Sequence, residues 1–75
     1  MDVKLPASDD PEMMYVISKW YQNEGDQINA GDVLVSYEAE KSIVDLEAPC
    51  SGVLKKIYFS EDEAVSAGSV ICTIE

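Results

Sequence analysis

The chain repeats itself at an offset of 37 residues, and this internal repeat limits the folds open to it. Residues 16–38 align with residues 53–75 without a gap, and eight of the 23 aligned pairs are identical, against roughly one or two expected by chance. The identical pairs are Val16/Val53, Lys19/Lys56, Tyr21/Tyr58, Glu24/Glu61, Ala30/Ala67, Gly31/Gly68, Val33/Val70 and Glu38/Glu75. Two repeats are too few for a solenoid, which needs about three stacked units. The repeat therefore predicts a closed domain with two-fold pseudosymmetry.

Both halves of the repeat carry the same succession of predicted elements. An apolar strand (residues 16–21, then 53–59) is followed by an acidic turn, a short apolar step, and a second strand that begins after Gly31 or Gly68. These two glycines indicate turns that need positive φ. The second strands alternate between apolar and polar residues, and no segment shows a sustained helical stripe, so the pattern predicts β structure.

The alternation assigns residues to an inner and an outer face. The inner set is Val33, Val35, Tyr37, Val44, Leu46, Val70, Cys72 and Ile74, and the outer set is Ser36, Glu38, Asp45, Glu47, Thr73 and Glu75. With residues 3–6 and 42–47 as the remaining strands, each half contributes four. We expect an all-β fold in one domain, residues 1–75, built as a flattened barrel or sandwich of two four-stranded antiparallel sheets.

The centre of the chain predicts a hairpin with Glu40 and Lys41 as its two-residue loop. Inner residues then face inner residues across the two strands. In this register the pairs are Tyr37/Val44, Val35/Leu46 and Val33/Ala48. Registers shifted by two residues in either direction keep the same faces together and also leave Lys41 in the loop or next to it. The offset of the repeat maps Lys41 onto Lys4, which makes this hairpin the counterpart of the place where the terminal strands meet. Lys41 is therefore predicted at the opposite end of the domain from the chain termini.

Size and charge exclude several classes of function. A chain of 75 residues leaves little room for an active-site cleft beside its core, so we do not expect a self-sufficient enzyme. A formal net charge of −10, with five lysines as the only basic residues, disfavours nucleic acids and anionic membrane surfaces. No signal peptide or membrane-spanning run is visible. Cys50 and Cys72 are read as ordinary thiols in a reducing compartment, with Cys50 the one we would consider reactive.

Two acidic clusters, residues 9–12 and residues 61–63, lack the spacing of a calcium-binding loop. They are interpreted as solvated turns, and no metal site is predicted. Residues 7–14 read as a surface loop after the first strand, in which Met13 and Met14 are expected to pack. Trp20 is expected to be buried or half-buried.

At the hairpin the residues resemble a known family. Glu38-Ala39-Glu40-Lys41-Ser42, followed by Glu47-Ala48-Pro49 and Ser51-Gly52, is similar to the lipoyl domain of 2-oxo acid dehydrogenase complexes, within the wider biotinyl/lipoyl attachment family. Biotinyl domains typically have Met on both sides of the lysine, whereas here Glu40 precedes it and Ser42 follows it. The family more often has Asp before the lysine and Ala after it.

The resemblance implies a non-catalytic carrier domain, part of a dihydrolipoamide acyltransferase component, with lipoate in amide linkage on Lys41 and Glu38, Glu40 and Ser42 as its motif context. It implies these partners: a lipoate-protein ligase or octanoyltransferase, a thiamin-dependent 2-oxo acid decarboxylase, the acyltransferase core and dihydrolipoamide dehydrogenase. In the family the loop after the first strand helps partners choose their domain, which makes Asp9, Asp10 and Glu12 candidate recognition residues. The expected location is the cytoplasm, or the mitochondrial matrix for a eukaryotic complex, and the isolated domain is expected to be monomeric.

Two other readings of Lys41 stay open from the residues alone. One is a biotin carboxyl carrier domain that uses the same lysine. The other is an unmodified barrel-type interaction module in which Lys41 is an ordinary turn residue balanced by nearby carboxylates. The loop acids likewise have a plain alternative, a merely solubilising surface loop.

Overall fold

The computed structural model describes residues 1–10 and 12–75; Pro11, within the predicted loop 7–14, lies outside the described residues. The described chain forms eight strands. They are β1 (Asp2–Lys4), β2 (Met14–Trp20), β3 (Gln27–Ile28), β4 (Val33–Ala39), β5 (Ser42–Glu47), β6 (Gly52–Ile57), β7 (Ala64–Ser66) and β8 (Val70–Ile74). The expected eight-stranded all-β fold is confirmed, with strand ends that differ from the predicted ones by one to two residues. None of the described segments is a helix long and apolar enough to cross a membrane.

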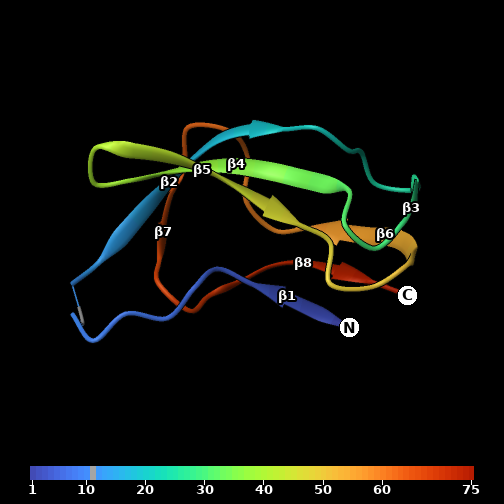
Figure 1. Ribbon diagram of the computed structural model, residues 1–75, viewed down its shortest axis with the longest axis horizontal. Coiled ribbons are helices and arrows are strands. Elements are labelled where there is room, and N and C mark those ends of the chain that lie inside the picture. Colours follow the sequence, from blue (N-terminus) through green and yellow to red (C-terminus); the bar gives the residue numbers. More distant parts are fainter. Residues whose placement is uncertain (11) are drawn as a thin grey trace.

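The strands form two four-stranded antiparallel sheets packed as a flattened sandwich. Their orders are β1-β8-β6-β3 and β5-β4-β2-β7, and each sheet draws strands from both halves of the chain. The molecule is elongated, with extents of 33 × 19 × 19 Å. Figure 1 shows the β4–β5 hairpin at one end of the long axis and both termini toward the other, as predicted from the sequence.

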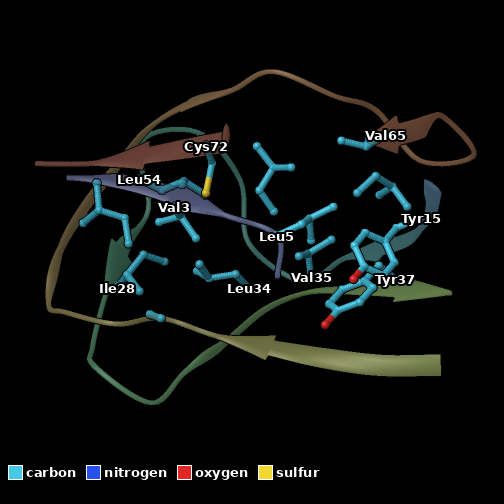
Figure 2. Packing of buried hydrophobic residues seen from close by; sticks show 14 residues of the cluster. Val3, Leu5, Tyr15, Ile28, Leu34, Val35, Tyr37, Leu54, Val65 and Cys72 are labelled. Atoms are coloured by element: carbon cyan, nitrogen blue, oxygen red, sulfur yellow. The ribbon is translucent and has the colours of Figure 1, made fainter. Parts of the chain in front are cut away.

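The residues that repeat conservatively along the sequence form the core between the sheets. Ile17 and Leu54, one residue from each half at the same position of the repeat, are both fully buried. The other such pairs are Ile28/Val65, Leu34/Ile71 and Val35/Cys72, all at most 1% exposed. Figure 2 shows core side chains converging from both sheets, among them the labelled Ile28, Leu34, Leu54, Val65 and Cys72. The pseudosymmetry read from the sequence is thus a symmetry of the packed interior, where burial of apolar surface stabilises the fold.

Each half carries the same two β-bulges. The pairing of β2 with β4 shifts at Ser18, and that of β6 with β8 shifts at Lys55, the equivalent residue. The pairing of β4 with β5 shifts at Leu34, and that of β8 with β1 shifts at Ile71. An extra residue bends a strand and turns two successive side chains to the same side. The second pair of bulges explains why Leu34 and Ile71 are buried although strict alternation faces them outward.

The hairpin register is confirmed over most of its length and fails at the bulge. Val35 faces Leu46 and Tyr37 faces Val44, as predicted. Beyond the bulge Val33 faces Glu47, not Ala48.

The strand pairing also corrects the predicted equivalence of Lys41 and Lys4. Asp2 faces Thr73 and Lys4 faces Val70 on β8. At the repeat-equivalent positions of β4, Ser36 faces Asp45 and Val33 faces Glu47. Lys4 therefore corresponds to Glu47 and lies within a strand, so the terminal strands have no counterpart of the turn that carries Lys41.

Glu24 and Glu61, at equivalent positions of the two acidic turns, make structural hydrogen bonds between the halves. Glu61 belongs to a cluster that the sequence predicted to be solvated. The Glu24 carboxylate accepts a hydrogen bond from the backbone N–H of Ile57 at 2.8 Å. The equivalent Glu61 carboxylate accepts one from the N–H of Trp20 at 3.0 Å. These hydrogen bonds join the two halves of the chain. Each contributes about 1 kcal/mol to the free energy of unfolding, or somewhat more because the acceptor is charged. Trp20 is half-buried as expected, and its indole N–H donates to the Phe59 carbonyl at 2.9 Å.

The edge strand β5 departs from the predicted inner and outer faces. Val44, predicted inward, is 38% exposed, because β5 lies at the sheet edge with β4 as its neighbour. Ser36, predicted outward, is buried; its hydroxyl lies 3.2 Å from the Tyr21 hydroxyl and 3.1 Å from an Asp45 carboxylate oxygen. A polar cluster therefore covers this part of the outer face of β4.

Cys72 is fully buried, and burial raises the pKa of its thiol to about 11 from the ordinary 9.0. The folded state binds the Cys72 proton more tightly than the unfolded chain does. The protonated thiol therefore contributes its full share to the free energy of unfolding below pH 9, and this contribution is lost as pH rises through 11. We expect the free energy of unfolding to fall by about 2 kcal/mol more in the wild type than in Cys72→Val between pH 8 and pH 11. Denaturant titrations of both proteins at each pH measure this difference. An equal fall in the free energy of unfolding of the two proteins between pH 8 and pH 11 would contradict the prediction.

Candidate functional site: the Lys41 turn

Lys41 lies on the two-residue turn that joins β4 to β5. Ala39 and Ser42 form the last pair of the ladder, which leaves Glu40 and Lys41 outside it. Glu40 has φ of 55°, a left-handed conformation that two-residue hairpin turns require and that residues other than glycine adopt uncommonly. This conformation reverses the chain sharply. Lys41 therefore stands at the end of a tight turn rather than in a long loop.

Packing beneath the turn fixes its position. Tyr37 of β4 and Tyr15 of β2 are buried, and their rings meet edge to face with centroids 5.0 Å apart. Figure 2 shows this pair at one end of the core. Burial, with a smaller contribution from Tyr15, raises the pKa of the Tyr37 phenol above its usual value. The two buried rings thus form the end of the core on the strands that lead to the turn.

Three of the five lysines are held by a neighbouring side chain. The pairs are Lys55 with the Glu75 carboxylate at 3.6 Å, Lys19 over the Tyr21 ring at 5.1 Å and Lys56 over the Tyr58 ring at 5.5 Å. Within the described part of the chain, Lys4 and Lys41 have neither an ion pair nor an aromatic ring beneath the amine. Lys41 is exposed and is the one of the two that lies on a turn. Its amine is therefore accessible to an enzyme.

The turn has an acidic setting. Glu38 and Glu40 are exposed beside Lys41, and Ser42 after it is a small, exposed residue. The sequence-predicted motif residues are thus brought together at one end of the molecule. Among residues 1–10 and 12–75, however, no three Asp, Glu, Cys or His side chains converge on a position that could hold a metal ion.

The described residues of the predicted recognition loop, 7–10 and 12–14, lie at the same end of the molecule as the hairpin (Figure 1). Asp9, Asp10 and Glu12 are all exposed. The Asp10 carboxylate accepts a hydrogen bond from the Glu12 N–H at 2.9 Å, and the Asp10 N–H donates to the Ser8 hydroxyl at 3.1 Å. Asp10 therefore shapes its own loop, whereas Asp9 and Glu12 leave their carboxylates toward solvent. Met13 packs against the core as expected, but Met14 is 46% exposed.

The other features considered from the sequence lie away from the turn. Cys50 is half-buried in the segment between β5 and β6, with its Sγ 3.5 Å from Met1 Sδ. A pocket of about 300 Å³ is lined by β1 together with Leu46, Glu47 and Pro49. Lys4 belongs to this pocket and Lys41 does not.

A flattened sandwich of two four-stranded sheets with an exposed lysine on a hairpin turn is the architecture that the sequence resemblance predicts for an attachment domain. Comparison with known proteins agrees: the family model described as "Biotin-requiring enzyme" matches residues 2–74. The chain therefore belongs to the biotinyl/lipoyl attachment family.

The curated relatives are acyltransferase components. The chain is 33% identical over 99% of its length to the dihydrolipoyllysine-residue acetyltransferase component of the pyruvate dehydrogenase complex of Zymomonas mobilis, and covers 17% of that protein. It is 33% identical over 95% of its length to the corresponding succinyltransferase component of the 2-oxoglutarate dehydrogenase complex of Rickettsia felis, covering 18% of it. The chain thus spans about a sixth of the length of these relatives.

Among solved structures, the lipoyl domain of the 2-oxoglutarate dehydrogenase complex of Azotobacter vinelandii has the same fold. The TM-score is 0.85 at 20% sequence identity, over 100% of this chain and 95% of that one. At this identity the match shows the fold alone.

Proposed function

We propose that the domain carries lipoate on Lys41 and moves acyl groups between the active sites of a 2-oxo acid dehydrogenase complex. The observation that carries the proposal is the exposed amine of Lys41 on a tight turn, with no ion-pair partner among the described residues. The acidic residue before Lys41 and the small residue after it favour lipoate over biotin. The relatives, which are acyltransferase components of pyruvate and 2-oxoglutarate complexes, support the same assignment.

The chain's own contribution to attachment is the Lys41 amine. In its deprotonated form, Nζ attacks the carbonyl carbon of an enzyme-bound lipoyl adenylate; the C–N bond forms, the bond to phosphate oxygen breaks, AMP leaves and Nζ loses a proton. The amide removes a positive charge and takes the formal net charge from −10 to −11. The sandwich does not unfold to present the amine, because the turn already projects it.

The bound group supplies a disulfide that accepts an acyl group with two electrons, passes the acyl group to a thiol and is then reoxidised. The domain contributes presentation and recognition, and its partners contribute catalysis. These partners are the lipoate-attaching enzyme, a thiamin-dependent decarboxylase, the acyltransferase core and dihydrolipoamide dehydrogenase. The proposed setting is the cytoplasm or the mitochondrial matrix, where such complexes would meet the domain.

Intact mass spectrometry tests the proposal directly. The 75-residue chain is incubated with ATP and either lipoate plus a lipoate-protein ligase or biotin plus a biotin-protein ligase. We expect one lipoyl increment in the first reaction and none in the second. A biotinyl increment alone would make the domain a biotin carrier, and no increment in either reaction would leave an unmodified interaction module.

A further inference from the structure

The sheet that carries Lys41 has one long edge strand. Among the described strands, β1, β3, β5 and β7 lie at the edges of the two sheets. Three of these have only two or three residues, whereas β5 has six, Ser42–Glu47. A short edge strand offers too few backbone groups for a further strand to pair with, and a long one offers a template. The outer edge of β5 is therefore the place where this fold can accept another strand.

This edge is exposed and carries aliphatic side chains. Ser42, Ile43, Val44 and Asp45 are all exposed, and the two aliphatic residues reach 64% and 38%. Natural edge strands are commonly protected by shortness, by proline or by a covering loop. None of these protects the four exposed residues in the described structure. Exposed aliphatic residues on a long edge strand favour pairing with another chain.

The charges on the outer face of β5 make the strand complementary to itself. Lys41 lies two residues before Ile43, and Asp45 lies two residues after it, so the three positions fall on one face of the hairpin. Two such strands can lie antiparallel about a two-fold axis through Ile43. Each Lys41 then lies opposite the Asp45 of the other copy, and the two isoleucines lie opposite each other. Pairs of opposite charge and pairs of aliphatic residues both stabilise neighbouring strands.

The backbone of the hairpin permits this register. Ala39 and Ser42 close the two-residue turn, and in such a turn the closing pair directs its N–H and C=O groups across the hairpin. Ile43 and Asp45 therefore direct theirs to the outer edge. A two-fold axis can pass through Ile43, Val44 or Asp45. The axis through Asp45 would oppose two carboxylates, and the axis through Val44 would oppose Ile43 to a carboxylate, so the axis through Ile43 is favoured.

Pairing through β5 closes after two copies. The contact uses the same strand in both chains, so it leaves no second long edge among the described strands and does not continue into a fibre. The interface is small and belongs to the transient class. The formal net charge of −10 opposes association at long range. At about 0.15 M salt, however, charges more than about 8 Å apart are largely screened, while pairs in contact are screened less.

We propose that the unmodified domain associates with a second copy of itself through β5, with Ile43 packed on Ile43 and Lys41 paired with Asp45 across a two-fold axis. The monomer expected from the sequence is then the form at low concentration. An amide on Lys41 removes the positive charge that Asp45 faces. On the carrier function proposed above, attachment of lipoate would therefore also release the dimer.

Sedimentation equilibrium of the unmodified chain, at about 0.15 M salt and up to about 1 mM protein, measures the dimer. We expect a dissociation constant of about 1 mM or lower for the wild type. Asp45→Lys and Lys41→Glu should each raise it at least about tenfold, because each variant places like charges opposite each other twice. The double variant Lys41→Glu/Asp45→Lys exchanges the two signs and should return it to within about threefold of the wild type.

Two control variants separate the pairing from net charge and from other registers. Asp2→Lys changes the net charge as Asp45→Lys does, but on β1, and should not weaken the dimer. Glu47→Lys lies on β5 itself and should also leave the dimer in place, because only an axis through Val44 would set Glu47 opposite Lys41. Asp45→Lys also loses the contact with the Ser36 hydroxyl. Thermal unfolding midpoints near that of the wild type show that the variants are folded.

The outcomes distinguish this proposal from the carrier function. A wild-type chain that stays monomeric at about 1 mM would overturn the dimer and leave the carrier function intact. So would a double variant as weak as the single ones, or equal weakening by Asp2→Lys. Lys41→Gln, which removes the charge as an amide does, should raise the dissociation constant without any lipoate. A chain that dimerises as expected but accepts no lipoate would overturn the carrier function alone.

Discussion

Lys41→Arg abolishes lipoyl addition, and Lys4→Arg leaves it unchanged; this is the largest functional effect we expect from any single substitution. Arginine keeps the positive charge and a similar length, but its guanidinium stays protonated and cannot act as the nucleophile. Lys4 is the demanding control because, like Lys41, it is exposed and has no ion-pair partner among the described residues. It lies within β1, however, where no turn presents it.

Peptide mapping of the modified wild-type protein locates the lipoyl increment, and the intact mass of both variants shows whether they accept one. We expect the increment on the peptide that contains Lys41 and on no other. The unfolding midpoint of Lys41→Arg should lie within about 2 °C of the wild type, since an exposed turn residue has few packing partners. An increment that persists in Lys41→Arg would mean that another lysine is the acceptor.

Gly52→Ala is expected to lower the free energy of unfolding by about 3 kcal/mol, the largest effect on stability predicted for a change of one methyl group. A Cβ at this position would lie 2.6 Å from the Glu75 carbonyl oxygen and 2.7 Å from Ile74 Cγ2. The neighbouring backbone is tightly paired, with the Val53 N–H donating to Glu75 O at 2.7 Å. The methyl group forces β6 and the end of the chain apart, and the midpoint of thermal unfolding should fall by more than about 10 °C.

Gly25→Asp is the matched control for Gly52→Ala. Gly25 has φ of 94°, but nothing lies within 4 Å of the Cβ position. The equivalent residue in the second half is Asp62, which holds φ of 71° without a glycine. We therefore expect the control to cost no more than about 1 kcal/mol. Calorimetry of both variants gives the comparison, and equal destabilisation would show that crowding at Gly52 is not the cause.

The repeat predicted the core through its conservatively paired apolar residues, whereas its identical pairs are all exposed or half-buried. The pairs Ile17/Leu54 and Leu34/Ile71 are similar in sequence for the reason that they occupy equivalent places in one core. The same alternation placed Glu40 and Lys41 outside the hairpin ladder, as the structure shows.

The errors came from features that local alternation does not contain. The bulge at Leu34 pairs Val33 with Glu47. At the equivalent bulge, Ile71 is an extra residue that strict alternation between two faces does not predict to be buried. The hydrogen bond from the Trp20 N–H to the Glu61 carboxylate joins residues far apart in the chain, so the sequence alone shows the acidic cluster at residues 61–63 only as a solvated turn.

The turn and the termini lie toward opposite ends of a molecule that is 33 Å long (Figure 1). This separation would determine how far Lys41 can move about an attachment point near the termini. In a longer chain of the kind found in the relatives, a segment joined after residue 75 would pivot near one end of the sandwich while Lys41 travels at the other. The folded domain would then act as a stiff section of the reach, adding on the order of its own length between a flexible tether and a flexible side chain. Two active sites too far apart for a lysine-borne group alone would come within range by rotation of the whole domain.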